Sequence, residues 1–276
     1  MQLGNEGDDR GNVEDKRGFQ VGGIHLGLGG LLIVGVLSLV FRTNLFSVVE
    51  GQGQGAPVEQ TGPQVEQRKQ AEQGLEKVAV GSFNDVQRTW TQTLKGYRDA
   101  KLVLFWDETQ SGCGGAQSAM GPFYCPSDER VYLDLGFYKE LATRFGAPGD
   151  FAQAYVVAHE VGHHVQKLLG TSAKVEAAQQ RAPASRNALS VKLELQADCF
   201  AGVWGHAAAQ RKLLDPGDVD EGLRAAASVG DDRIQKMAGR RVAPESFTHG
   251  SAAQRSSWFK RGFDRGDPAA CDTFAE

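Results

Sequence analysis

Residues 154–169 read AYVVAHEVGHHVQKLL and contain the motif H-E-x-x-H, which begins at His159 and ends at His163. The run is apolar around the motif, and with turn residues before it and Gly170 after it, it predicts a helix over about residues 151–169. In an α-helix, residues four apart lie almost above each other on one face. The two histidines are therefore expected to project from the same face, where they can bind one metal ion.

The residue types in this motif suit zinc chemistry. Neutral imidazole is a common ligand of the zinc ion, and Glu160 lies next to His159, close enough to hold a water molecule and take its proton. His164 points about 100 degrees away from His163 and is predicted to be structural, or to support a ligand from behind, instead of binding the metal itself. Two histidines satisfied by hydrogen bonds at a helix surface are the alternative, and the apolar flanks of the motif argue against it.

A third metal ligand must come from another segment. The extended pattern H-E-x-x-H-x-x-G-x-x-H is not completed, because Gln166 and Leu169 stand where it has Gly and His. Glu194 is predicted to be the third ligand, since it lies in an apolar stretch where a buried carboxylate needs a partner. Asp198 lies on the same helix face as Glu194. It is expected to accept the free N–H of His159 and to fix the tautomer of that histidine. Asp198 or another acid is the alternative ligand.

The hydrophobic periodicity of the surrounding sequence predicts an α+β fold. Apolar residues at three- and four-residue steps indicate helices, and apolar or alternating runs indicate strands. Together they predict one globular domain over residues 78–276. Its expected strands are 102–106 and 130–135, and its expected helices after the metal-binding helix are about 188–212 and 219–238.

The segments before residue 78 are predicted to lie outside this domain. Residues 1–21 are polar and charged, as is typical of a disordered cytoplasmic tail. Residues 22–41 contain no Asp, Glu, Lys or Arg and match the roughly 20 residues that cross a bilayer as a transmembrane helix. A cleaved signal peptide is the alternative for this run. Residues 42–77, rich in Gly, Gln and Glu, are predicted to be a flexible linker.

Flanking charge predicts how this apolar run is oriented in the cell membrane. Arg10, Lys16 and Arg17 precede it, whereas Arg42 alone follows closely. Positively charged flanks favour the cytoplasmic side. The N-terminus is therefore expected in the cytoplasm and the domain outside it.

The four cysteines fit an oxidising compartment. Cys113 and Cys125 bracket a Gly-rich loop and are predicted to pair, which leaves Cys199 with Cys271. Sequence alone permits three pairings, and four free thiols are the alternative. The net charge of -4 and the absence of a long Lys/Arg cluster give no reason to expect nucleic-acid binding.

H-E-x-x-H followed by E-x-x-x-D resembles the gluzincins, the thermolysin-like metallopeptidases and the membrane-bound prenyl-protein endopeptidases. The chain is similar, more closely, to the bacterial neutral zinc metallopeptidase family over nearly its whole length apart from the linker. The resemblance implies a zincin-like fold, mainly helical, with a small sheet beside the active-site helix. The segments that carry it are N-V-E-D-x-R-G (12–18), GPFYCP (121–126), VYLDL (131–135), AHEVGHHVQ (158–166), LELQADCFAG (193–202) and RGF-x-x-GDP-x-x-CDTF (261–274).

The resemblance also implies a catalytic role for His249, which lies between Thr248 and Gly250. In gluzincins a histidine from a late segment commonly stabilises the oxyanion, and His249 stands in the matching order along the chain. The strand expected at 130–135 is predicted to bind the substrate backbone by strand addition.

The expected function is a Zn²⁺-dependent endopeptidase that hydrolyses peptide bonds of a peptide or protein substrate. It is expected to be anchored in the cell membrane through residues 22–41. A non-catalytic zinc-binding scaffold or interaction protein of the cell envelope is the alternative. A further alternative is a structural protein of the cell envelope in which the H-E-x-x-H motif is incidental.

Overall fold

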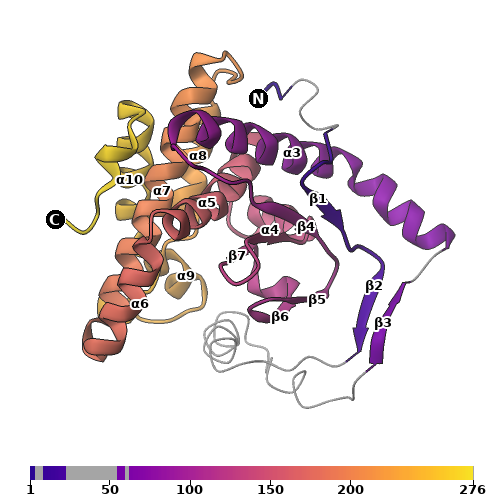
Figure 1. Ribbon diagram of the computed structural model, residues 1–276, viewed down its shortest axis with the longest axis horizontal. Coiled ribbons are helices and arrows are strands. Elements are labelled where there is room, and N and C mark those ends of the chain that lie inside the picture. Colours follow the sequence, from indigo (N-terminus) through magenta and orange to yellow (C-terminus); the bar gives the residue numbers. More distant parts are fainter. Residues whose placement is uncertain (4–8, 23–54, 60–61, 276) are drawn as a thin grey trace.

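A four-stranded sheet with helices packed beside it makes up much of the described chain (Figure 1). The computed structural model describes residues 1–3, 9–22, 55–59 and 62–275. The strands are β1 (Val13–Asp15), β2 (Phe19–Gly22), β3 (Gly55–Glu59), β4 (Lys101–Leu104), β5 (Glu108–Ser111), β6 (Gly114–Gln117), β7 (Phe123–Cys125) and β8 (Arg130–Leu133). The main sheet has the order β1-β4-β8-β7, with only β7 antiparallel to its neighbour, and β2–β3 and β5–β6 form separate pairs.

The α+β, mainly helical class predicted from the sequence is confirmed. The predicted helix at 151–169 is α5 and that at 188–212 is α7, whereas 219–238 is divided into two helices at Gly230. The helices are α3 (Pro63–Thr93), α4 (Gly136–Thr143), α5 (Asp150–Leu168), α6 (Thr171–Arg181), α7 (Arg186–Gln210), α8 (Asp218–Ser228), α9 (Asp231–Met237) and α10 (Ala252–Arg265).

Helix α5 lies at the centre of the core, packed against α3, α7 and α8. Glycine allows the neighbouring helices to approach closely. A Cβ on Gly162 of α5 would lie 3.0 Å from the carbonyl oxygen of Ala197 in α7. A Cβ on Gly262 of α10 would lie 1.9 Å from that of Cys199. Helices α5, α7 and α10 therefore meet backbone to backbone beside the H-E-x-x-H motif, which brings their polar side chains together.

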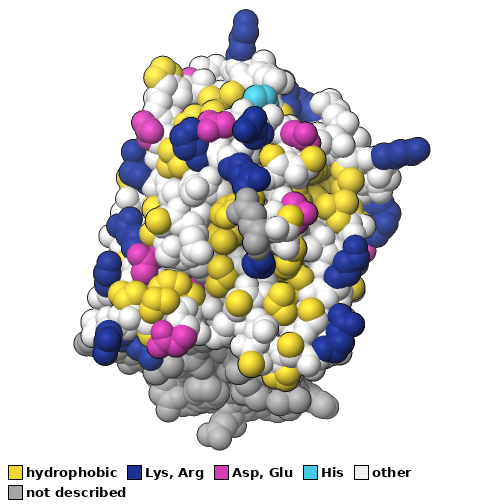
Figure 2. Space-filling model, turned by 90° about the vertical axis from the view of Figure 1, so that its left-hand side faces the viewer, with side chains coloured by type: hydrophobic (Ala, Val, Ile, Leu, Met, Phe, Trp, Pro, Cys, Tyr) yellow, Lys and Arg dark blue, Asp and Glu magenta, His cyan; other side chains and the backbone are white. Residues whose placement is uncertain are grey.

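The face that includes α6, α7 and α10 mixes charged and apolar side chains (Figure 2). Lys and Arg side chains are scattered over it, with Asp and Glu among them. On α10, for example, Lys260 pairs with Asp264 at 2.6 Å. The cations visible on this face are thus not gathered into one basic patch of the kind that attracts a polyanion.

The N-terminal segment belongs to the domain, which corrects the predicted disordered tail at 1–21. Strand β1 pairs with β4 in parallel, and Arg17 is only 3% exposed. The guanidinium of Arg17 lies 2.9 Å from a carboxylate oxygen of Asp15 and 2.7 Å from one of Glu76. Charges that the sequence suggested were solvated are therefore buried in ion pairs.

The predicted linker at 42–77 is also wrong over its last part, because α3 begins at Pro63. The polar first half of this helix carries Glu72, which is 5% exposed and accepts hydrogen bonds from the Trp106 indole (2.8 Å) and from Arg17 (3.4 Å). Helix formation here depends on these long-range partners, since the local sequence has little apolar periodicity.

Within the described ranges, no helix is long and apolar enough to span a bilayer. The predicted anchor at 22–41 falls, apart from Gly22, outside those ranges. Its flanks are nevertheless informative, because β1 precedes it in the sequence and β4 follows it, and the two strands pair. A chain that crossed a membrane once between them would put them on opposite sides. The pairing therefore contradicts the predicted topology with residues 1–21 inside and the domain outside.

We expect positions before and after the apolar run to be accessible from the same side of a membrane. Single cysteines introduced at the exposed residues Asp9 and Lys260 should both react, or both resist, when a membrane-impermeant maleimide is added to vesicles of known orientation. Labelling of one position with protection of the other would show that β1 and β4 do not pair in the membrane-bound protein.

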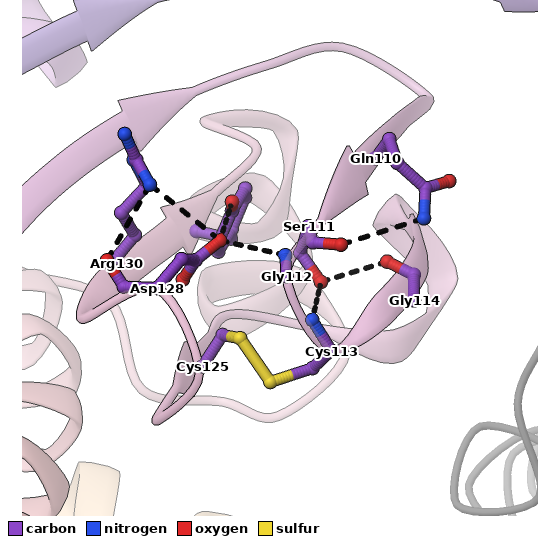
Figure 3. The surroundings of a disulfide bond; sticks show 9 residues. Gln110, Ser111, Gly112, Cys113, Gly114, Cys125, Asp128 and Arg130 are labelled. Atoms are coloured by element: carbon purple, nitrogen blue, oxygen red, sulfur yellow. Dashed lines mark hydrogen bonds and ion pairs between the residues drawn. A yellow bond between two sulfur atoms is a disulfide. The ribbon is translucent and has the colours of Figure 1, made fainter.

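Both predicted disulfides are present, Cys113–Cys125 and Cys199–Cys271. The first joins the turn between β5 and β6 to β7 (Figure 3). The carboxylate of Asp128 holds the same turn, because it accepts hydrogen bonds from the backbone N–H of Gly112 at 2.7 Å and from the Tyr132 hydroxyl at 2.6 Å. The turn is thus fixed at the edge of the sheet that lies next to α5.

Candidate metal centre

Three side chains that the sequence analysis chose as metal ligands lie together between α5 and α7. The Nε2 atom of His159 is 3.2 Å from one carboxylate oxygen of Glu194, and the Nε2 atom of His163 is 3.5 Å from the other. Donor atoms about 2.0–2.1 Å from a tetrahedral zinc ion are separated by about 3.3 Å. The three residues therefore fit the coordination of Zn²⁺, with both imidazoles offering the same ring nitrogen.

Asp198 lies directly behind His159, where the sequence analysis expected it. Its carboxylate is fully buried and accepts the Nδ1–H of His159 at 2.8 Å, which leaves the Nε2 atom for a metal. Burial raises the pKa of Asp198, but the Arg255 guanidinium and the His159 imidazole hold that pKa below its usual value. Asp198 therefore stays ionised at neutral pH and fixes the tautomer of His159.

Arg255, on α10, was not among the site residues predicted from the sequence. Its guanidinium donates two hydrogen bonds to Asp198, at 2.8 and 2.9 Å, and lies 3.9 Å from Glu194. Tyr155, one turn before His159, donates its hydroxyl to the same carboxylate at 2.5 Å. In the sequence Arg255 is one of several cations on an amphipathic helix, so only the tertiary fold distinguishes it.

Glu160 lies beside the ligand group and remains available as a base. It is 8% exposed, and burial raises the pKa of its carboxyl group. The backbone of Tyr124 in β7 lies beside this carboxyl group and offsets part of the rise in its pKa. A carboxylate with a raised pKa accepts a proton more readily than an ordinary surface glutamate does.

The strand beside Glu160 is β7, and this corrects the prediction for residues 130–135. Those residues include β8, which lies between β4 and β7 and has both edges paired. Strand β7 is one of the two edge strands of this sheet, with β1 at the other edge, and the Tyr124 backbone of β7 lies beside Glu160. Of the two edges, β7 is the one next to α5 and Glu160, so it is the edge that could bind an extended substrate.

His249 is held by Asp231, which was not among the site residues predicted from the sequence. One carboxylate oxygen of Asp231 accepts the backbone N–H groups of Thr248, His249 and Gly250 at 2.7–3.0 Å. The other lies 3.2 Å from His249 Nδ1. The side chain of His249 is 45% exposed. Partial burial lowers the pKa of His249, but the hydrogen bond to Asp231 and the negative charge of Glu194 outweigh it and raise that pKa.

His164 lies apart from the ligand group, as predicted. Its Nδ1 atom is 2.8 Å from the hydroxyl of Tyr124, and its Nε2 atom is 2.6 Å from the carbonyl oxygen of Arg98. His164 therefore connects α5 to β7 and to the segment that precedes β4. This contact keeps the edge strand beside Glu160.

Comparison with known proteins agrees with this arrangement. Residues 3–274 match the family described as "Putative neutral zinc metallopeptidase". The chain is 48% identical over 282 residues to the uncharacterized protein YpfJ of Escherichia coli K12, covering 96% of each chain. It is 46% identical over 207 residues to the uncharacterized protein Rv2575 of Mycobacterium tuberculosis, covering 71% and 69% of the two chains. No solved structure matches it. The chain belongs to the putative neutral zinc metallopeptidase family.

Proposed function

We propose that this protein is a zinc-dependent endopeptidase with a gluzincin-like ligand set of His159, His163 and Glu194. The observation that carries the proposal is the convergence of these three ligand atoms, all within 4.8 Å of one another, beside the buried carboxylate of Glu160. A non-catalytic scaffold would need the three metal ligands, but a general base next to them would have no function in it. The direct test is hydrolysis of peptides by the zinc-loaded protein.

Bound zinc would supply a Lewis acid that lowers the pKa of water and polarises the scissile carbonyl. Glu160 accepts a proton from the attacking water and delivers it to the leaving amine. His249, whose pKa is raised by the hydrogen bond to Asp231, donates a hydrogen bond to the oxygen that becomes negative in the transition state. The edge of β7 holds the substrate backbone in an extended conformation beside Glu160.

We also propose that the domain acts outside the cytoplasm, attached to a membrane through the apolar run at 22–41. The two disulfides support an oxidising compartment. The pairing of β1 with β4 supports placing both flanks of that run on the same side as the domain.

Removal of the His249 imidazole should change the alkaline limb of the pH profile. Because its pKa is raised, His249 stays protonated to higher pH than a free histidine, and activity that needs the proton is lost as pH rises through that pKa. Asp231→Asn should therefore move the alkaline limb of kcat/KM to lower pH. His249→Gln should abolish this limb and lower kcat by about 10²- to 10³-fold.

The measurement is kcat/KM for a peptide substrate across the pH range in the parent and both variants. His206→Gln is the matched control, because His206 lies on α7 and contacts Phe263 of α10 instead of Asp231. An unchanged alkaline limb in both Asp231→Asn and His249→Gln would remove His249 from the mechanism.

A further inference from the structure

The second histidine of the motif has a hydrogen-bond partner of its own, and that partner is neutral. His163 Nδ1 lies 2.9 Å from the side-chain oxygen of Gln166, three residues later on α5. Gln166 is completely buried. Whether its oxygen or its nitrogen faces His163 determines which ring nitrogen of His163 carries the proton.

The far end of the Gln166 amide decides this orientation. Its Nε2 atom lies 2.7 Å from the carbonyl oxygen of Leu193, and a carbonyl oxygen can only accept. The amide nitrogen must therefore face Leu193, and the amide oxygen must face His163. An oxygen at that position accepts the Nδ1–H of His163, so the Nε2 atom of this ring carries no proton and faces Glu194.

Gln196 of α7 continues this chain of hydrogen bonds to the C-terminal segment. The second N–H of Gln166 donates to the Oε1 atom of Gln196 at 3.1 Å, and the Nε2 atom of Gln196 donates to the carbonyl oxygen of Cys271 at 3.0 Å. Cys271 is bonded to Cys199 on α7, so its carbonyl is held in place. We call Gln166 and Gln196 the amide relay. Main-chain carbonyl oxygens accept from both of its amides and set their direction.

We propose that Gln166 is a positioning residue that fixes the tautomer of His163, and that Gln196 and the C-terminal segment hold Gln166 in the orientation this requires. The inference rests on the proposed function to the extent that it takes His163 to be a metal ligand. The two histidines are then oriented by different chemistry. The carboxylate of Asp198 orients His159, whereas a neutral amide orients His163 and adds no charge behind the site.

The test uses the metal-free, full-length protein labelled with ¹⁵N in its histidines. At a pH where the imidazole is neutral, two-bond ¹H–¹⁵N correlations distinguish the two tautomers. In the parent, His163 should be present as the Nδ1–H form alone. Gln166→Met keeps the length of the side chain but removes the acceptor, so both tautomers should appear and zinc affinity should fall by about 10- to 100-fold.

Two further variants, at Gln196 and Gln87, show whether an effect of Gln166→Met is specific to this chain of hydrogen bonds. Gln196→Met leaves Gln166 its bond to the Leu193 carbonyl, so its effects on the tautomer and on zinc affinity should be in the same direction but smaller. Gln87→Met is the matched control, because Gln87 is a buried amide of α3 (5% exposed) whose partners are the carbonyl oxygen of Ala100 and the hydroxyl of Tyr97, not a ligand histidine.

A single Nδ1–H tautomer and unchanged zinc affinity in Gln166→Met would overturn the proposal. A loss of zinc affinity in Gln166→Met no larger than the loss in Gln87→Met would also overturn the proposal. These readouts are independent of catalysis, so the amide relay can hold even if the protein hydrolyses no peptide. Conversely, a failed relay leaves the peptidase proposal standing.

Discussion

Replacement of Glu160 by glutamine is expected to remove nearly all peptide hydrolysis while zinc remains bound. Glutamine has the same size and keeps an acceptor oxygen beside the Tyr124 backbone. It cannot take a proton from water. General acid and base assistance contributes about 10²- to 10⁴-fold, so the loss should appear in kcat, with KM little changed. Steady-state kinetics on a cleaved peptide, with the zinc content of the same sample, measures both effects.

Glu176→Gln is the matched control for this variant, because Glu176 is an exposed glutamate on α6. It should retain both zinc and activity. A scaffold whose metal site serves only binding predicts that Glu160→Gln behaves like this control in every assay. Full hydrolytic activity of Glu160→Gln would show that another group acts as the base.

Alanine at any of the three ligands is expected to reduce zinc binding strongly. His159→Ala, His163→Ala and Glu194→Ala each remove one of three converging donor atoms. Asp198→Ala leaves the three ligands in place but removes the group that orients His159, and losses of zinc affinity of this kind are about 10- to 100-fold. Competition against a chromogenic chelator gives the zinc dissociation constant of each variant. Full zinc occupancy in Glu194→Ala would place the third ligand elsewhere.

Asp198→Ala has a second effect that needs a control. It leaves the guanidinium of Arg255 buried without its main partner, and an unpaired buried charge costs about 3–5 kcal/mol. Asp198→Asn keeps an acceptor for His159 and should be less destabilised. Thermal melts of the metal-free variants separate this loss of stability from the loss of zinc affinity.

Apart from the Cys199–Cys271 disulfide, which joins residues 72 apart, the features predicted correctly from the sequence are fixed by local spacing. Helix α5 follows from apolar periodicity between turn residues, and its 3.6-residue repeat alone places His159 and His163 on one face. Glu194 and Asp198 share a face of α7 for the same reason. The structure then brings the two faces together, with His159 Nε2 3.2 Å from Glu194 and Nδ1 2.8 Å from Asp198.

The features that were missed depend on contacts between distant segments. Strand β1 is a short polar run that becomes a strand only because β4 pairs with it. Arg255 and Asp231 have no local signature, since each gains its role from a partner more than 15 residues away. The break between α8 and α9 falls at Gly230, where a Cβ would lie 2.3 Å from the backbone nitrogen of Ala252. The hydrophobic periodicity of one segment gives no information on such packing between distant segments.

The central claim, that the three ligands and Glu160 form a working peptidase site, is tested most directly on the unmodified protein. One sample is analysed for zinc and incubated with a peptide library whose products are identified by mass spectrometry, before and after treatment with a chelator and re-addition of zinc. The expected result is one zinc ion per chain, with new peptide termini that disappear on chelation and return with zinc. Stoichiometric zinc without cleavage of any library peptide would contradict it.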